Sequence, residues 1–527
     1  MDIFSLLARN ANKFPEQEAL VCGERRRSWS QLYQRVEALA GAMSYRGIEK
    51  GDKVALLLDN SDYFIEIHFA VARLGAIGVP LNYRLAGDEL AYILNNSDSK
   101  MLFYGSTFEK AVEDIRTRIP KIESSIQVGN EGALYDQMLA EGRISPPVLV
   151  EGTDPNLVLY TSGTTGRPKG AVLTHDNSIW NALNMVIDAR IEHEDRGIVI
   201  PPLYHSAAIN CWMLPHVFVG AALVIENTFN PVELPKRLVE ECITSMFLVP
   251  AMYNFLLQVP GIETYDLDFI RLLGSGASIM PVELKQKVHK LFPNAEIIDV
   301  YGLTEAGPGV TILKAKDAFR KEGSVGQALS TLEVRVVDTN GKEVGSGEVG
   351  EIIVRGPTIM KEYYQLPEAT ATALREGWLY TGDLARMDEE GFLYVVDRKK
   401  DMIISGGENI YPAEVEAVLY QHAKILDAAV IGYPDAQWGE SICAIIVVRP
   451  GETLTPEEVV EFTKGKFAGY KKPRQVVFVE ALPRNPSGKV LKTVLRQKYG
   501  NMSPGHSLPN ESNSFRPQEE SQGSKAK

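Results

Sequence analysis

The chain has 527 residues, well beyond the length at which one hydrophobic core stops growing, so we expect at least two folding units. Its apolar fraction of 45% and its charged fraction of 23% are those of an ordinary soluble globular protein. The net charge of −13 argues against nucleic acid as the main partner, because phosphate backbones are held mainly by clustered Lys and Arg.

From about residue 50 onward, short apolar runs alternate with amphipathic stretches. We expect strands at 54–58, 101–104, 157–160, 198–200, 223–225, 246–249, 270–273 and 297–300, and helices at 63–74, 232–241 and 282–291. Strands that alternate with helices predict βαβ units and largely parallel sheets. In such sheets, ligands bind in the crevice at the carboxyl ends of the strands.

The pattern changes near residue 325, where segments 332–338 and 350–355 predict a hairpin with Asn340-Gly341 as its type I′ turn. A charged run at 397–401 precedes a shorter α+β segment, with helices expected at 413–422 and 456–467 and strands at 428–431, 443–448 and 475–479. Past residue 500 the chain has almost nothing to bury. We therefore predict an N-terminal domain at 1–398, a C-terminal domain at 399–500 and a disordered tail at 501–527.

Cysteine usage and apolar patterning indicate a cytoplasmic protein with no integral membrane segment. The four cysteines show neither metal-like spacing nor a disulfide framework: Cys22, Cys211, Cys242 and Cys443. The first residues do not form a secretory signal, because charges interrupt them at Asp2, Arg9 and Lys13. The most apolar stretch, at 197–225, contains prolines and histidines, which favours buried strands and loops over a membrane span.

A loop rich in glycine and hydroxyl groups follows the strand expected at 157–160. Its glycines let the backbone approach a ligand, its hydroxyls donate hydrogen bonds, and one lysine supplies charge, a combination suited to cradling phosphates. These residues are Thr161, Ser162, Gly163, Thr164, Thr165, Gly166, Lys169 and Gly170. The loop is not a Walker A motif, because Gly163 and Gly166 are too close together.

Three further motifs carry groups that could handle a nucleotide. A hydroxyl and a carboxylate, Thr304 and Glu305, follow the strand at 297–300 and could hold a phosphate and Mg²⁺. Asp383 is a candidate acceptor for ribose hydroxyls, with Arg398 in reach of phosphate or ribose. The segment 485–489 ends in Lys489, which taken alone would be an exposed lysine in a turn.

Together these motifs resemble the adenylate-forming superfamily, which includes acyl-CoA synthetases, nonribosomal adenylation domains and firefly-type luciferases. The resemblance runs from about residue 10 to about residue 498, and bacterial fatty-acid–CoA ligases are the most similar members. It implies an α/β fold: a large N-terminal domain of βα layers with a distorted barrel, and a small, mobile α+β C-terminal domain.

The resemblance also implies roles for residues in the use of ATP and Mg²⁺. Residues 161–170 would cover the β- and γ-phosphates, and Thr304 would contact the α-phosphate. Glu305, with Thr164, would hold Mg²⁺, while Asp383 and Arg398 would bind the ribose. The adenine would be framed by Gly276, Ala277, Ser278, Asp299, Tyr301 and Gly302. Lys489 resembles the catalytic lysine that bridges the substrate carboxylate and the α-phosphate.

For the second half-reaction the resemblance implies coenzyme A as co-substrate. The small domain would pivot at Lys400, and Gly407 would leave room for the pantetheine arm. Trp438 matches a tryptophan that stacks on the CoA adenine, and Lys472 and Arg474 would meet CoA phosphates. The sequence leaves open whether the protein is a homodimer or a monomer.

The acyl pocket would be gated by His205 and lined by small residues that offer no partner for an α-amino group: Ala207, Ala208, Gly276 and Gly307. These features favour an ATP-dependent acid–CoA ligase for fatty or other apolar acids. Segments 82–85 and 275–281 resemble bacterial fatty-acid–CoA ligases, which favours medium- or long-chain acids, whereas segment 302–308 also resembles aryl-acid ligases. An aryl-acid ligase of the coumarate or benzoate type is the alternative, and a stand-alone amino-acid adenylating enzyme is disfavoured. A catalytically silent scaffold would be expected to lack Glu305 or Lys489.

Overall fold

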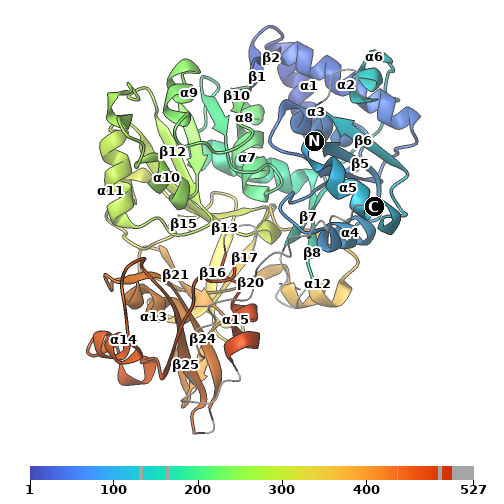
Figure 1. Ribbon diagram of the computed structural model, residues 1–527. Coiled ribbons are helices and arrows are strands. Elements are labelled where there is room, and N and C mark those ends of the chain that lie inside the picture. The colour runs from blue at the N-terminus through green and yellow to red at the C-terminus, as the bar shows by residue number, and fades with distance from the viewer. Residues whose placement is uncertain (130–133, 162–166, 436, 485–488, 501–527) are drawn as a thin grey trace, which may run out of the picture. The chain divides into compact units, whose positions relative to one another are not determined.

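The computed structural model describes residues 1–129, 134–161, 167–435, 437–484 and 489–500. The chain divides into two compact units, Met1–Val395 and Val396–Lys527 (Figure 1). The sequence places the boundary three residues later, after residue 398. The expectation of a mixed α/β fold with a large N-terminal and a small C-terminal part is confirmed.

The first sheet of the larger unit has seven strands in the order β18-β8-β7-β4-β3-β5-β6. Its bounds are β18 (Glu362–Tyr363), β8 (Lys169–Thr174), β7 (Pro155–Thr161), β4 (Ile77–Pro80), β3 (Lys53–Leu57), β5 (Ser99–Gly105) and β6 (Ser124–Val128). From β7 to β6 the strands are parallel, whereas β8 runs antiparallel to β7 and β18. The parallel strands are apolar runs with buried side chains, as expected where both faces are covered.

The second sheet has nine strands in the order β15-β14-β13-β12-β11-β9-β10-β1-β2. Its bounds are β15 (Gln327–Ala328), β14 (Gly309–Leu313), β13 (Glu296–Gly302), β12 (Leu272–Gly276), β11 (Ser245–Leu248), β9 (Arg196–Val199), β10 (Ala222–Ile225), β1 (Glu18–Cys22) and β2 (Arg25–Ser28). The strands from β13 to β1 are parallel, and the edge pairs are antiparallel. The expected strands and helices between residues 196 and 302 are therefore present.

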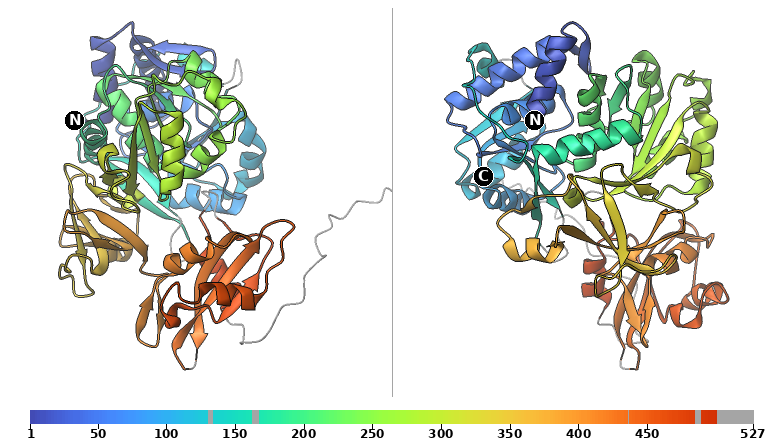
Figure 2. Two further views of the ribbon diagram at one scale, coloured as in Figure 1. Left: turned by 90° about the vertical axis from the view of Figure 1, so that its left-hand side faces the viewer. Right: turned by 180° about the vertical axis from the view of Figure 1, so that it is seen from behind.

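Helices cover the faces of these sheets (Figures 1 and 2). One face of the nine-stranded sheet packs on α9 (Leu234–Glu240), α10 (Pro250–Leu256) and α11 (Val282–Leu291). The main core involves α1 (Ile3–Lys13), α2 (Trp29–Tyr45), α3 (Asp62–Arg73), α6 (Leu134–Ala140), α7 (His175–Asp188) and α8 (Leu214–Val219). The outer face of the seven-stranded sheet packs on α4 (Gly87–Asn96) and α5 (Glu109–Ile115).

The third sheet is antiparallel and has five strands. They are β16 (Glu333–Val337), β17 (Val349–Arg355), β20 (Trp378–Met387), β19 (Leu374–Arg375) and β21 (Leu393–Arg398), with α12 (Pro367–Ala373) beside β19. The predicted hairpin of β16 and β17 is confirmed, but the prediction of a type I′ turn at Asn340-Gly341 is wrong. Asn340 lacks the positive φ that such a turn requires, because Asp338 closes a longer loop by accepting hydrogen bonds from the backbone of Asn340 and Lys342.

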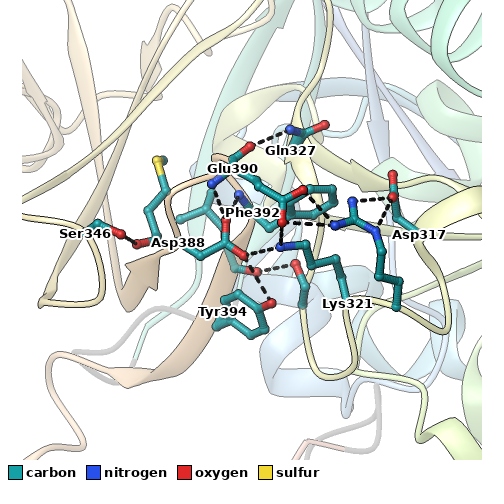
Figure 3. A network of polar contacts seen from close by, with 12 residues as sticks. Asp317, Lys321, Gln327, Ser346, Asp388, Glu390, Phe392 and Tyr394 are labelled. Atoms are coloured by element: carbon teal, nitrogen blue, oxygen red, sulfur yellow. Dashed lines mark hydrogen bonds and ion pairs between the residues drawn. The ribbon is translucent and has the colours of Figure 1, made fainter.

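A network of ion pairs anchors the turn between β20 and β21 within the larger unit (Figure 3). Lys321 Nζ lies 2.7 Å from Asp388 and 2.5 Å from Glu390, and Arg320 pairs with Glu390 and Asp317 at 2.7 Å each. Leu393 also exchanges backbone hydrogen bonds with the segment 325–326. The last residues of the larger unit are therefore fixed before the chain enters the smaller one.

The smaller unit is an α+β fold with a five-stranded sheet. Its strands are β22 (Ile403–Ser405), β23 (Glu408–Ile410), β24 (Ile425–Asp435), β25 (Gly439–Val448) and β26 (Gln475–Phe478), and its helices are α13 (Pro412–Leu419), α14 (Pro456–Thr463) and α15 (Lys492–Tyr499). Alternate side chains of β24 and β25 point to opposite faces, so the sheet carries a core on each face. In the described part of the chain, no helix is both long and apolar enough to cross a membrane.

Candidate functional site

Glu305 is the centre of a cluster that unites distant segments of the larger unit. It lies in a single 3-10 turn (Thr304–Ala306) directly after β13. Its Oε1 accepts hydrogen bonds from Thr161 Oγ1 at 3.2 Å and from Tyr363 OH at 2.9 Å. The ammonium of Lys169 lies over the Tyr363 ring, 5.2 Å from its centroid. The structure thus brings Thr161, Lys169 and Glu305 together at the carboxyl ends of β7 and β13.

This cluster fits a hard divalent cation, because a carboxylate and a neighbouring hydroxyl are the oxygen ligands that Mg²⁺ prefers. In the described residues, no group of three or more His, Cys, Asp and Glu side chains could form an all-protein metal cage. The cation would therefore be held by one carboxylate and by ligand phosphates, the usual arrangement for Mg²⁺. Ser162, Gly163, Thr164, Thr165 and Gly166 lie outside the described residues.

Thr304 is held by Ser206, whose hydroxyl lies 3.1 Å from that of Thr304. Ser206 and the half-buried His205 precede a seven-residue π-helix (Ala207–Met213). His205 packs on Tyr204 with ring centroids 4.4 Å apart, and burial raises the pKa of Tyr204 to about 12. Extra-wide helical turns of this kind are rare and occur frequently at functional sites. The expected gate and pocket residues 205–208 therefore lie beside Thr304, at the start of this π-helix.

Glycines lie where the expected pocket has no room for a side chain. A Cβ at Gly276, the last residue of β12, would lie 2.8 Å from the Phe247 ring and 3.0 Å from the carbonyl oxygen of Val300. Gly307 has φ of +97°, and a Cβ there would lie 2.3 Å from the carbonyl oxygen of Thr358. Both positions therefore require glycine.

Asparagine side chains on α7 tie the two walls of this region together. Asn181 donates to the backbone carbonyl of Asn210 in the π-helix at 2.7 Å and accepts from the N–H of Gly309 at 2.9 Å. Asn210 donates in turn to the carbonyl of Gly307 at 3.2 Å. Sequence reasoning missed Asn181. The available signal is the recurrence of Asn177, Asn181, Asn184 and Asp188 along one face of an otherwise apolar helix.

Asp299, expected at the adenine, already has a partner. It forms an ion pair with Lys285, whose side chain is only 2% exposed. Burial raises the pKa of Asp299, and the ammonium of Lys285 opposes that shift. The carboxylate therefore has a structural role in holding α11 against β13. Its neighbours Ala277 and Ser278 are exposed at the carboxyl end of β12.

Asp383 lies in β20 and accepts a hydrogen bond from Tyr301 OH at 2.7 Å. Its own N–H donates to Thr381 Oγ1 at 3.1 Å, and the carboxylate is largely buried. A carboxylate fixed in this way is a suitable acceptor for paired hydroxyls. The link joins Asp383 to the end of β13, next to Gly302 and Thr304.

In the smaller unit, the structure brings together three of the expected residues. Arg474 lies over the Trp438 ring, 5.0 Å from its centroid, and Trp438 as a whole residue is 37% exposed. The N–H of Gly406 donates to the carbonyl of Trp438 at 2.7 Å, and Gly407 has φ of +86° with open space where a Cβ would point. An exposed aromatic face with a guanidinium above it suits a flat, anionic group.

The other expected residues of this unit lie at its surface or serve its fold. Lys489 and Lys400 are exposed, and Lys472 is half-buried. The backbone N–H of Arg398 donates to Asp397, whose carboxylate also accepts from the N–H of Ala413 in the first turn of α13. Asp397 therefore acts as a helix cap, a role that its sequence neighbourhood did not reveal.

A family model described as AMP-binding enzyme matches residues 7–364, and one described as AMP-binding enzyme C-terminal domain matches residues 414–489. Feruloyl-CoA synthase of an Amycolatopsis species is 37% identical over 494 residues, which cover 93% of this chain and 98% of that protein. The long-chain-fatty-acid–CoA ligase FadD13 of Mycobacterium tuberculosis is 37% identical over 496 residues, which cover 94% and 98%. The structure of o-succinylbenzoate–CoA synthetase of Bacillus subtilis with ATP and magnesium ion superposes with a TM-score of 0.82 at 29% identity and covers 93% of this chain and 99% of that one.

Proposed function

Because the chain belongs to the AMP-binding enzyme family and is an acid–thiol ligase, we propose that it activates a medium- or long-chain fatty acid with ATP and transfers it to coenzyme A. The observation that carries the proposal is the cluster of Thr161, Lys169 and Glu305 at the carboxyl ends of β7 and β13, which belong to two different sheets. It combines a hydroxyl and an ammonium, which can bind phosphates, with a carboxylate, which can bind the cation of a nucleoside triphosphate.

In the first half-reaction, a carboxylate oxygen of the acid attacks the α-phosphorus of ATP. The new P–O bond forms as the bond between the α-phosphorus and the α,β-bridging oxygen breaks, and pyrophosphate leaves. Lys169 and Thr161 would bind the departing phosphates, Thr304 the α-phosphate and Asp383 the ribose hydroxyls. When bound, Mg²⁺ supplies positive charge that offsets the charge developing on the phosphates. Lys489 would neutralise the two anions that meet at the α-phosphorus.

In the second half-reaction, the thiol sulfur of coenzyme A attacks the acyl carbonyl carbon. The C–S bond forms, the C–O bond to AMP breaks, and the thiol proton leaves to solvent. Trp438 would stack on the CoA adenine, and Lys472 and Arg474 would meet its phosphates. Gly407 would admit the pantetheine arm, because no atom lies within 4 Å of the place where its Cβ would be.

The fatty-acid assignment is supported by the small, apolar side chains of Ala207 and Ala208, which offer no polar partner, and by the similarity to a long-chain ligase. A second candidate is an aryl acid. It is favoured by the sequence similarity to a feruloyl-CoA synthase, a ligase whose acid is aromatic.

A panel of acids from acetate to palmitate, with benzoate and coumarate, tests the proposal. AMP release is measured with and without coenzyme A, and the thioester is identified by mass. We expect CoA-dependent AMP release to be greatest with medium- or long-chain acids. Greatest turnover of coumarate would move the substrate to aryl acids, and absence of AMP release with every acid would refute the ligase assignment.

A further inference from the structure

Tyr363 contacts both charged groups of the cluster of Thr161, Lys169 and Glu305, namely Lys169 and Glu305. Its hydroxyl donates to Glu305 Oε1 at 2.9 Å, while the face of its ring lies under the Lys169 ammonium at 5.2 Å. A phenol ring can serve both groups at once, because its edge carries the O–H and its face attracts a cation.

The backbone holds Tyr363 in place on three sides. It belongs to β18, which pairs antiparallel with β8 so that Tyr363 lies opposite Ala171. Its N–H donates to Thr370 Oγ1 at 3.0 Å, and the next N–H, of Tyr364, donates to the carbonyl of Gly170 at 2.7 Å. Two residues upstream of β18, the N–H of Met360 donates to the backbone carbonyl of Glu305 itself at 2.9 Å. The segment 360–364 therefore clamps both β8 and the turn that carries Glu305.

The hydrogen bond from Tyr363 selects which carboxylate oxygen of Glu305 remains available. Oε1 accepts from both Tyr363 and Thr161, whereas Oε2 has no hydrogen-bonding partner in the described part of the chain. Two donors on one oxygen orient the other toward a ligand.

We propose that Tyr363 is a positioning residue that presents Glu305 Oε2 to the Mg²⁺ of bound ATP and sets the Lys169 ammonium beside it. The assignment rests on the proposed ligase function, because it requires that Mg·ATP binds at this cluster. Tyr363 does not touch the reacting atoms. Its removal should therefore change how ATP binding depends on Mg²⁺, and leave the attack of the thiol on a supplied acyl adenylate unchanged.

The test is direct binding of ATP to the purified full-length protein by titration calorimetry, over a series of Mg²⁺ concentrations and in EDTA. Tyr363→Phe keeps the ring under Lys169 and removes only the hydroxyl. Tyr364→Phe is the matched control, because it removes the neighbouring hydroxyl, which donates instead to Asp98 at 2.7 Å. Thr161→Val removes the other donor to Oε1 and tests the same oxygen independently.

For Tyr363→Phe we expect the Mg²⁺ concentration that half-saturates the gain in ATP affinity to rise about tenfold, the effect of losing one hydrogen bond to a charged group. ATP affinity in EDTA should stay within about twofold of wild type, because the ring remains. Thr161→Val should shift in the same direction, and Tyr364→Phe should match wild type in both measurements.

The two proposals fail in different ways. If wild type binds Mg·ATP and Tyr363→Phe shows the same Mg²⁺ dependence, the role of Tyr363 is overturned and the ligase function stands. A wild-type protein that binds no ATP at any Mg²⁺ concentration would overturn both. Should Tyr363→Phe unfold at assay temperature, as monitored by circular dichroism, the Thr161→Val measurement decides: an unchanged Mg²⁺ dependence there overturns the role of Oε2.

Discussion

The candidate residues of the larger unit are joined to one another and to the core, whereas those of the smaller unit lie mostly on its surface. Thr161, Glu305 and Tyr363 form one hydrogen-bonded set, and Asp299 pairs with a fully buried lysine. Lys489 and Trp438 are exposed, although the ring of Trp438 packs against Gly406.

This difference separates two ways of building a site. In the larger unit the groups that would meet ATP also hold strands and helices together, so a substitution should affect stability and binding at once. In the smaller unit the groups that would act lie mostly at the surface of the unit. Substitutions there should affect one half-reaction and leave the unfolding temperature unchanged.

Lys489→Ala is the strongest test of this separation. Without the ammonium, the charge at the α-phosphorus is no longer offset, and we expect pyrophosphate release to fall about a thousandfold, as for loss of a transition-state donor. Thioester formation from a supplied acyl adenylate should be largely spared, and so should the unfolding temperature. Lys498→Ala, on the exposed part of α15, is the control. Equal loss of both half-reactions would refute the assigned role.

Lys285→Met should show the opposite behaviour in the larger unit. It leaves the Asp299 carboxylate buried without its partner, which typically costs about 3–5 kcal/mol. Because burial already raises the folded-state pKa of Asp299, the folded state holds the proton more tightly, and the loss should grow as pH rises through that pKa. Thermal unfolding across pH measures it. The double variant Lys285→Met/Asp299→Leu should recover stability; if it does not, the ion pair is not the cause.

Asn181→Ala would sharpen the comparison, because this side chain links the π-helix to Gly309. Leaving a buried N–H unpaired costs about 1–3 kcal/mol, so we expect lower stability together with a higher KM for the acid. Asn184→Ala is the matched control: it breaks a similar contact, to the N–H of Thr331 at 3.1 Å, and should lower stability alone. An acid KM raised equally by both would show that stability, not position, matters.

Trp438→Ala should have the smallest effect. Stacking on a base is worth about 1–3 kcal/mol, so we expect the KM for coenzyme A to rise about tenfold with little change for ATP. Tyr470→Ala removes another exposed aromatic ring of the same unit and should leave both KM values unchanged. An unaltered KM for coenzyme A in Trp438→Ala would exclude stacking.

Local patterns predict the elements of this protein well, because its helices and strands are periodic over several residues. The helix expected at 282–291 is α11 with the same bounds, and the expected strands at 157–160 and 297–300 lie within β7 and β13. The prediction of a type I′ turn at Asn340-Gly341 is wrong because the neighbouring Asp338 side chain accepts hydrogen bonds from the loop backbone and fixes a different loop geometry. A dipeptide preference gives way to such local competition.

The site was harder to predict, since its supports come from residues far apart in the chain. Tyr363 is 58 residues from Glu305, and Asn181 is 128 residues from Gly309. Neither belongs to the motifs that carry the family resemblance. Those motifs identify residues that would bind ligands. The residues that hold them in place can be identified only from the assembled strands, because the supporting contacts join distant parts of the chain.

The π-helix at Ala207–Met213 has a consequence for changes in chain length. A wide turn of this kind contains more residues per turn than an ordinary helix, and it runs directly into α8. Deleting one residue within it would let the segment rewind as α-helix, while Pro215 and the end at Gly220 stay where they are. His205 and Ser206 would stay close to their present places, because the wide turn holds about one residue more than an α-helix over the same rotation, but the pocket side chains within it, such as Ala207 and Ala208, would point in other directions. Insertions and deletions should therefore be tolerated far less well here than in the surface loops.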